Sequence, residues 1–341
     1  MSTATRTAPQ GDPGARAAAP RPGLRARLRP HGMVWLVWRQ HRAGLWTVLA
    51  LAAATTGALL WVRGDLADTL AANPLVAGED FDMALVPHVD RIDLVGLALT
   101  FVPLLIGVFL GAPLFAGDLE SGTAKLVGVQ SSSSRRWLLT KLGTAAAVAC
   151  LGAVAVGLAF RGWWDLISAW GIGPTFETTQ VFDSTGPVLV AMTLLALLIG
   201  ATVGLYLRRT LPAMVVTLGI LVALKIAWEP FRLAFGSTTT VTTSDGTASG
   251  PPRPPDGAVH LDTFRLAADG GSHDGESCVP PGQVEPDDAW CEESQEIVGW
   301  SVEYLPLSQL APMQWLSAAA LGAVALGVGV LLRHAARRAL R

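Results

Sequence analysis

The sequence predicts an all-α membrane protein with six transmembrane helices, cytoplasmic N- and C-termini, and a large extracytoplasmic loop before the last helix. Three observations predict this fold class. The chain of 341 residues is 51% hydrophobic and only 15% charged, well below the roughly 25% of a typical soluble chain. Six apolar segments are long enough to cross a bilayer, and the charge of the connecting loops alternates along the chain. Such hydrophobicity with a net charge of only −2 also excludes intrinsic disorder.

Six segments satisfy the length of about 20 mostly apolar residues that a membrane-spanning helix needs. Only Lys225 is ionisable within them, near an end where its stem can carry the ammonium to the interface. Arg208 and Arg209 alone separate the fourth and fifth segments, which predicts a tight helical hairpin. The predicted spans are Gly44–Val62, Leu94–Ala116, Leu142–Phe160, Pro187–Leu207, Thr210–Trp228 and Met313–Leu332. Tryptophans near their ends are typical of an aromatic belt: Trp46, Trp61, Trp137, Trp163, Trp164, Trp228 and Trp315.

Loop charges predict the orientation. One alternating set of segments, 1–43, 117–141, 208–209 and 333–341, carries 18 basic and 3 acidic residues. The opposite set, 63–93, 161–186 and 229–312, carries 6 basic and 24 acidic residues. Because Lys and Arg concentrate in cytoplasmic loops, the first set is predicted to be cytoplasmic, together with both termini.

The acidic segment 229–312 is predicted to be an extracytoplasmic loop. Its stretch Gly236–Asp256 is rich in Ser, Thr, Gly and Pro and is interpreted as a flexible linker. Cys278 and Cys291 follow, and in an oxidising compartment they favour a disulfide that would stabilise the loop by about 3 kcal/mol. A metal site that also uses His273 is the alternative, although the spacing matches no zinc pattern. A third cysteine, Cys150, lies within a predicted span and is interpreted as a buried small hydrophobe.

Catalytic and cofactor motifs are missing from the sequence. The nearest approach to a phosphate-binding P-loop runs from Gly117 to Gly122, but Thr123 and Ala124 precede the lysine. No protease or esterase motif lies in a span, and no Asp, Glu or His lies at mid-membrane depth, where ion-coupled carriers place their relays. We therefore expect no enzyme activity, no metal and no cofactor in this chain, and any use of ATP requires a separate ATPase.

Small residues at helical spacing indicate close helix packing. Gly107 with Gly111 and Gly200 with Gly204 form two Gly-x-x-x-Gly pairs, which let helix backbones approach each other. They serve either packing within one subunit or a dimer contact. Pro103 predicts a kink in the second span.

Two predicted cytoplasmic segments have features beyond charge. In the leader, residues Leu24–Arg42 combine tryptophans with basic flanks, which suits an interfacial helix or a plain topological anchor. In loop 117–141, Asp118 and Glu120 fall at the membrane exit and Gly122 breaks the helix. Ser131–Ser134 is predicted to form a turn and helix cap before the third span, so the loop is a short hairpin suited to docking on another protein.

The loop resembles that of permease subunits of type-2 ABC (ATP-binding cassette) exporters. Those permeases carry an acidic residue, Glu-x-Gly-Thr, a Ser-rich turn, and then Arg and Lys before the third span. The resemblance implies an ATPase-coupling loop, with Glu120, Gly122 and Thr123 in the coupling turn and Arg135 behind it. The matching residues are Asp118, Glu120, Gly122, Thr123, Gln130, Ser131, Ser133, Arg135, Trp137 and Lys141.

The resemblance implies a permease of an ATP-driven exporter in a bacterial plasma membrane. A partner ATPase would bind ATP and Mg, and a second permease, as a homodimer or a related chain, would complete the complex. Membrane lipids are expected partners, nucleic acid is not, and the substrate would be a small molecule, lipid or peptide. The alternative is a non-transporting membrane adaptor or sensor whose outer loop binds a ligand or partner. The expected regions are a leader (1–43), spans one to five (44–228), the outer loop (229–312), and the last span with a basic tail (313–341).

Overall fold

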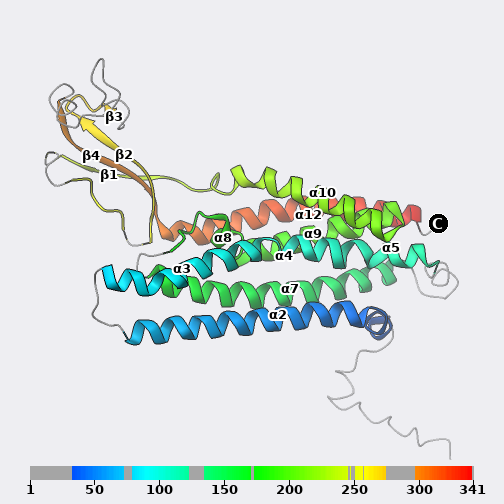
Figure 1. The fold of residues 1–341 in the computed structure, drawn as a ribbon. Helices are drawn as coiled ribbons and strands as arrows, with labels where there is room; N and C mark the ends of the chain where they lie inside the picture. Colours follow the sequence, from blue (N-terminus) through cyan, green and yellow to red (C-terminus); the bar gives the residue numbers. More distant parts are fainter. Residues whose placement is uncertain are drawn as a thin grey trace, which may run out of the picture.

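The protein is a bundle of long helices with a small β-sheet at one end (Figure 1). The computed structural model describes residues 33–72, 79–122, 134–169, 173–244, 246, 250–255, 257–273 and 296–339. Within them, six helical segments are long and apolar enough to cross a membrane. Their elements are α2 (Met33–Ala72), α3 (Glu79–Thr100), α4 (Val102–Leu105), η1 (Ile106–Gly111), α5 (Ala112–Glu120), α7 (Ser134–Ser168), α9 (Gly186–Leu207), α10 (Thr210–Trp228) and α12 (Leu310–Ala339).

The two ends of the bundle differ in charge. We call the end on the right of Figure 1 the basic end. Helices α2 and α7 begin there, α5 and α12 end there, and α9 turns into α10 there. The opposite end is the sheet end. Arginines gather at the basic end: Arg39, Arg42, Arg135, Arg136, Arg208, Arg209, Arg333, Arg337 and Arg338.

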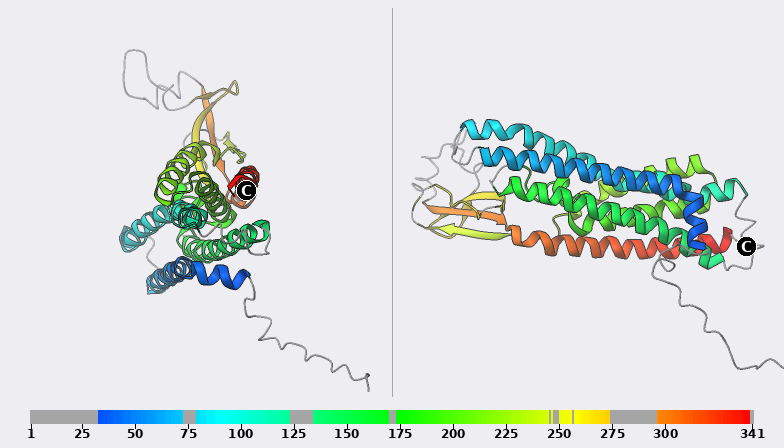
Figure 2. Two further views of the ribbon diagram at one scale, coloured as in Figure 1. Left: turned by 90° about the vertical axis from the view of Figure 1, so that its right-hand side faces the viewer. Right: turned by 90° about the horizontal axis from the view of Figure 1, so that it is seen from below.

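Helix α2 continues well beyond its predicted span on both sides. It includes the described part of the expected interfacial segment, and its first turns run crosswise to the rest of the helix (Figure 2). In these turns the Arg39 guanidinium lies 5.2 Å from the centre of the Trp35 ring, and Trp35 is 46% exposed. A basic residue over an exposed indole suits the headgroup region of a bilayer.

The second span is interrupted near its middle. A turn at Phe101 separates α3 from α4, and Pro103 lies in the first turn of α4, where its missing N–H costs no helical hydrogen bond. The π-helix η1 follows, which is a wider turn that often marks a functional site. A kink at Pro103 was expected, whereas the π-helix was not, because its sequence carries no distinct signal.

Helix α9 is the centre of the bundle. It packs against α12, α7, η1, α5 and α10, and 72% of its most apolar window is buried. In contrast, the corresponding windows of α2, α10 and α12 are only 11–17% buried. A helix that is apolar on all sides is thus enclosed by its neighbours, and the outer helices present their apolar faces outward.

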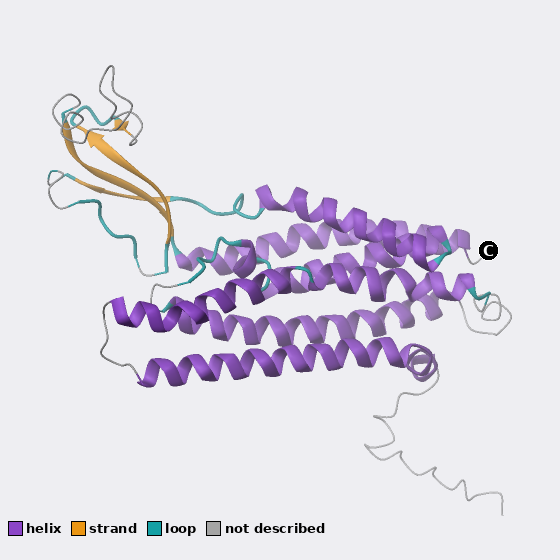
Figure 3. Ribbon diagram, in the orientation of Figure 1, coloured by secondary structure: helices purple, strands orange, loops and turns teal. Residues whose placement is uncertain are grey.

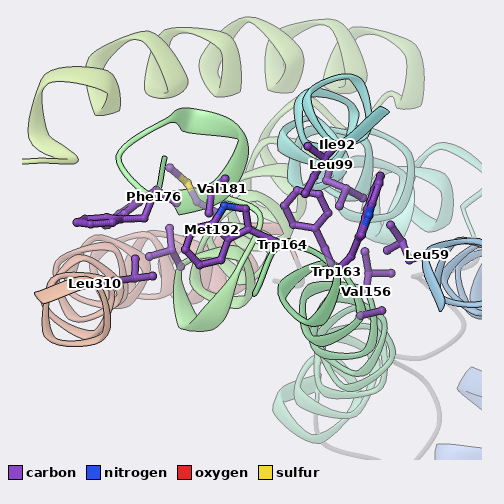
Figure 4. Close-up of a cluster of buried hydrophobic side chains, with 14 of the residues drawn as sticks. Leu59, Ile92, Leu99, Val156, Trp163, Trp164, Phe176, Val181, Met192 and Leu310 are labelled. Atoms are coloured by element: carbon purple, nitrogen blue, oxygen red, sulfur yellow. The ribbon is translucent and has the colours of Figure 1, made fainter. Parts of the chain in front are cut away.

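The predicted aromatic belt divides into two groups. Trp46, Trp61 and Trp315 are exposed, as a belt requires. Trp137, Trp163, Trp164 and Trp228 are buried in the protein, so the belt interpretation is wrong for them. Figure 4 shows Trp163 and Trp164 inside the core between residues of several helices, and the Trp164 indole N–H donates to the Pro174 carbonyl at 2.8 Å.

A four-stranded antiparallel sheet extends from the sheet end, so the expectation of an all-α protein is wrong for this part of the chain (Figure 3). Its order is β1-β4-β2-β3, with β1 (Thr239–Thr243), β2 (Val259–Ala267), β3 (Ser272–His273) and β4 (Ile297–Leu305). The strands are rich in Thr, Val, Ile and aromatic residues, which favour extended backbone. Bulges at His260/Asp262 and Leu266/Ala267 disturb the alternation of β2, which weakens its period-two signal in the sequence.

The expected flexible linker Gly236–Asp256 contains β1, which pairs with β4 from Thr239↔Tyr304 to Thr243↔Trp300. Composition alone suggested a linker, whereas pairing with a distant strand orders it. Ser237 follows α10, and Gln309 lies in the 3₁₀ turn η4 (Leu307–Gln309) before α12. Hydrogen bonds of 2.6–2.9 Å between these two residues join the two segments. Cys278 and Cys291 lie outside the described residues, so their disulfide stays a prediction.

Candidate functional site

The last turns of the second span contact three other spans at the basic end. Helix α5 ends at Glu120, within the predicted loop 117–141. Its final residues bond to α2, α7 and α10 through two separate networks, one around Asp118 and one around Glu120. Because α5 also packs against α9, this short segment joins most of the bundle.

Asp118 forms a buried ion pair with Lys141, which lies two turns into α7. The Lys141 side chain is fully buried and Asp118 is 7% exposed. The second carboxylate oxygen of Asp118 accepts a hydrogen bond of 2.7 Å from the Gln40 amide in the first turns of α2. The Asp118 cluster, which we define as Asp118, Lys141 and Gln40, therefore links the starts of two spans to the end of a third.

Aromatic rings surround the buried ammonium. Lys141 Nζ lies 5.5 Å from the centre of the Phe115 ring and 5.2 Å from that of Trp137, and the two rings meet edge to face at 5.6 Å. These contacts replace part of the hydration that Lys141 gives up. Breaking such a pair by removing one partner leaves an uncompensated buried charge and costs about 3–5 kcal/mol. The cluster thus holds α2, α5 and α7 in one arrangement.

Glu120 caps the N-terminus of α10. One of its carboxylate oxygens accepts hydrogen bonds from the Thr210 backbone N–H at 2.9 Å and from the Thr210 hydroxyl at 2.7 Å. A carboxylate at this position also interacts favourably with the positive end of the helix dipole. The helix α5 ends here because Gly122 adopts the left-handed conformation, with φ of +73°. The coupling turn expected from the sequence is therefore tied to the fifth span.

The four glycines of the two Gly-x-x-x-Gly pairs all lie where the second span and α9 pack closely within this chain. A Cβ on Gly111 would lie 2.8 Å from the Leu197 carbonyl oxygen, and one on Gly200 or Gly204 would collide with the backbone of η1 and α5. Gly107 would likewise meet the Ala196 carbonyl at 2.8 Å. The glycines thus bring the π-helical middle of the second span directly against the backbone of α9.

A second ion pair, with a buried carboxylate and a partly buried ammonium, lies toward the sheet end. Lys225 of α10 pairs with Asp183, which follows the short helix α8 (Thr179–Phe182) and is 3% exposed. The Trp228 indole N–H donates to the other oxygen of Asp183 at 3.3 Å. Nearby, the Gln314 amide of α12 donates to the Thr185 hydroxyl at 2.8 Å. From the sequence we expected the Lys225 ammonium to reach the membrane interface, whereas the structure pairs it with the Asp183 carboxylate.

The other predicted site residues are distributed as follows. Arg135 is exposed in the first turn of α7, which begins at Ser134. Residues 131–133, the rest of the predicted serine-rich turn and cap, lie outside the described residues. Thr123 and Gln130 lie outside the described residues. Among the residues that the structure describes, no three His, Cys, Asp or Glu side chains gather where they could hold a metal ion.

Sequence reasoning missed Gln40 and Asp183, and it missed the pairing of Lys141 with Asp118. Gln40 belongs to a segment interpreted only for its tryptophans and arginines, and nothing in the sequence marks it. Lys141 and Asp118 flank the same loop, and residues at the end of one span and the start of the next lie at similar depth, which is a usable signal for pairing. Asp183 was counted only as one acidic residue of an outer loop.

Comparison with known proteins agrees with the resemblance in the loop. The family model described as "ABC-2 membrane transporter related" matches residues 44–232. These residues include the first five predicted spans, the Asp118–Lys141 and Glu120–Thr210 contacts and the four packed glycines. No curated protein and no solved structure matches the chain. The family model covers more than half of the sequence and the structure supplies six apolar spans, so the chain belongs to the ABC-2 membrane transporter related family of multi-pass membrane proteins.

Proposed function

We propose that this chain is the permease subunit of an ATP-driven ABC exporter, whose ATPase is a separate protein that docks on the basic end. The observation that carries the proposal is the family match over the first five spans, with the predicted coupling loop at one end of the bundle. Family membership implies a permease that works with an ABC ATPase. Export, rather than import, rests on the resemblance of loop 117–141 to the exporters.

The proposed orientation places the basic end in the cytoplasm. The arginines at the starts of α2 and α7, in the turn between α9 and α10, and at the end of α12 all lie on this side. Short loops rich in arginine remain on the cytoplasmic side during insertion. The sheet, with its acidic segment, would then face the outside of a bacterial plasma membrane.

The two networks of α5 supply a route for the coupling. In this proposal, the ATPase presses on the turn after Glu120 when its nucleotide-binding halves close. Movement of that turn reaches α10 through the Glu120–Thr210 bonds and reaches α2 and α7 through the Asp118 cluster. The π-helix η1 directly precedes α5 in the second span. Its wider turns are a place where the helix can change its winding.

The complex is proposed to contain two permeases, either two copies of this chain or one copy with a related chain. The ATPase would bind ATP and Mg, and this chain would contribute no catalytic group or cofactor. The substrate class would be a small molecule, a lipid or a peptide.

The test is copurification of an ATPase with the tagged chain, extracted from native membranes in mild detergent. The first variant is Arg135→Glu, because Arg135 is exposed in the first turn of α7 and an acidic residue there is compatible with a helix N-terminus. Arg338→Glu is the matched control, since it makes the same charge change at the basic end outside the loop. We expect Arg135→Glu to reduce the bound ATPase activity at least several-fold, and Arg338→Glu to leave it unchanged.

Glu120→Lys and Glu120→Gln separate coupling from folding. Lysine removes the cap of α10 and reverses the charge, whereas glutamine keeps an acceptor for the Thr210 bonds. A coupling role predicts loss of substrate-stimulated ATP hydrolysis in Glu120→Lys and its retention in Glu120→Gln. If the wild-type chain brings down no ATPase at all, the adaptor or sensor alternative is favoured, and the exposed edge strand β1 becomes the surface to examine.

A further inference from the structure

An apolar groove runs along the outside of the bundle between α7 and α12, with α9 as its floor. Its volume is about 930 Å³, and helix residues of these three elements line it from Leu139 and Arg333 at the basic end toward Ala319. A second apolar hollow of about 580 Å³ shares Gly322 and Ala325 with it and continues to Trp315. The groove therefore follows the membrane-spanning part of α12.

The groove has one ionisable lining residue, at its basic end. Arg333 is exposed, and within the described part of the chain no carboxylate forms an ion pair with it. Arg337 lies one turn further along α12 and is also exposed, so both guanidinium groups occupy the same side of the helix. An apolar groove with a guanidinium group at its mouth matches a molecule with a long hydrocarbon chain and an anionic head.

The groove is long enough for one acyl chain and its headgroup. The lining on α12 extends from Ala319 to Arg333, which is about 21 Å at 1.5 Å per residue. The lined length of about 21 Å exceeds the hydrocarbon thickness of one leaflet, which is about 15 Å.

We propose that this groove is a binding site for one anionic phospholipid of the leaflet at the basic end, with its phosphate at Arg333 and an acyl chain between α7 and α12. The groove is lined by residues of α7, α9 and α12, and neither Asp118 nor Glu120 is among them. The inference does not depend on the proposed ATPase. The lipid would fill the space between two helices that flank α9 and so hold their separation.

Glycines give the groove its width and supply a direct way to close it. Gly143, Gly322 and Gly329 line it, and a Cβ on each would meet no atom within 4 Å. A larger side chain at Gly329 therefore enters the groove rather than the protein core. Gly327, on the same helix, also has open space around it but is not part of the lining, so it provides a matched control.

The experiment counts lipids bound to the delipidated, full-length chain by native mass spectrometry. Phosphatidylglycerol and phosphatidylcholine with identical acyl chains are titrated separately. We expect tighter binding of phosphatidylglycerol to the wild type. Arg333→Gln should weaken phosphatidylglycerol binding about 5-fold, the factor for one arginine near an anionic lipid surface, and leave phosphatidylcholine unchanged. The control Arg338→Gln, which changes an arginine outside the lining, should bind like the wild type.

Closing the groove should remove the site for both lipids. We expect Gly329→Leu to lower the binding of both, and Gly327→Leu to leave it intact. Equal binding of the two lipids to the wild type, or equal effects of Arg333→Gln and Arg338→Gln, would overturn the proposal. A loss of dimer in Gly329→Leu without any change in bound lipid would assign the groove to a second copy of the chain instead.

Discussion

Replacing Lys141 with methionine should destabilise the protein far more than replacing both members of its ion pair. Methionine keeps the length and apolar contacts of the lysine, so the packing against Phe115 and Trp137 is largely retained. The change leaves Asp118, which is 7% exposed, without the ammonium. We expect a loss of about 3–5 kcal/mol in the free energy of unfolding, the cost of breaking a buried pair by removing one partner.

The double variant Asp118→Leu with Lys141→Met tests the electrostatic reasoning. Both charges are then absent, so most of the stability should return, to within about 1–2 kcal/mol of the wild type. The remaining loss comes from the lost Gln40–Asp118 hydrogen bond and from imperfect repacking around the new side chains. Thermal denaturation in detergent, monitored by tryptophan fluorescence, would measure the stability of Lys141→Met, Asp118→Leu and the double variant. A double variant as unstable as the sum of the two single changes would refute the account of the cluster.

Three further changes address other contacts. Glu120→Ala removes the cap of α10 and should speed hydrogen exchange in the first turn of that helix. Gly200→Ala places a Cβ against the backbone of the second span and should cost about 1–3 kcal/mol, whereas Gly219→Ala, which has open space in α10, should be neutral or stabilise by about 0.5–1 kcal/mol; equal melting temperatures would contradict the close approach. Asp183→Asn deprives Lys225 of its counter-charge and should cost about 1.5–3 kcal/mol, because the ammonium is only partly buried, and adding Lys225→Gln should recover part of that loss in the same melting assay.

The membrane-spanning helices could be predicted from the sequence because length and hydropathy decide them. Each of the six predicted spans lies on one apolar helical segment of the structure. The true helices are longer: α7, for example, begins at Ser134, before the predicted Leu142. Hydropathy stops at the first charged residue, whereas the helix continues and brings Lys141 into the core, where Asp118 compensates its charge.

The sheet and the buried ion pairs could not be predicted in the same way. β1 lies in a segment whose composition is that of a linker, and only its pairing with β4 makes it a strand. Asp183 and Lys225 are separated by 42 residues, and Gln40 and Asp118 by 78. Such contacts depend on how the helices pack, which hydropathy and local motifs do not encode. Asp118, Glu120 and Gly122 could nevertheless be selected from the sequence, because the family motif and the membrane exit coincide there.

The most direct test of the central claim is a photocrosslinker placed next to the coupling turn in living cells. Position 121 is suitable, since Ser121 is exposed and directly follows Glu120. Position 296, where Glu296 is exposed at the sheet end, is the control. The account predicts that the adduct from position 121 contains a protein with an ABC ATPase sequence, and that the adduct from position 296 does not. Adducts without any ATPase at position 121, or equal ATPase capture at both positions, would contradict it.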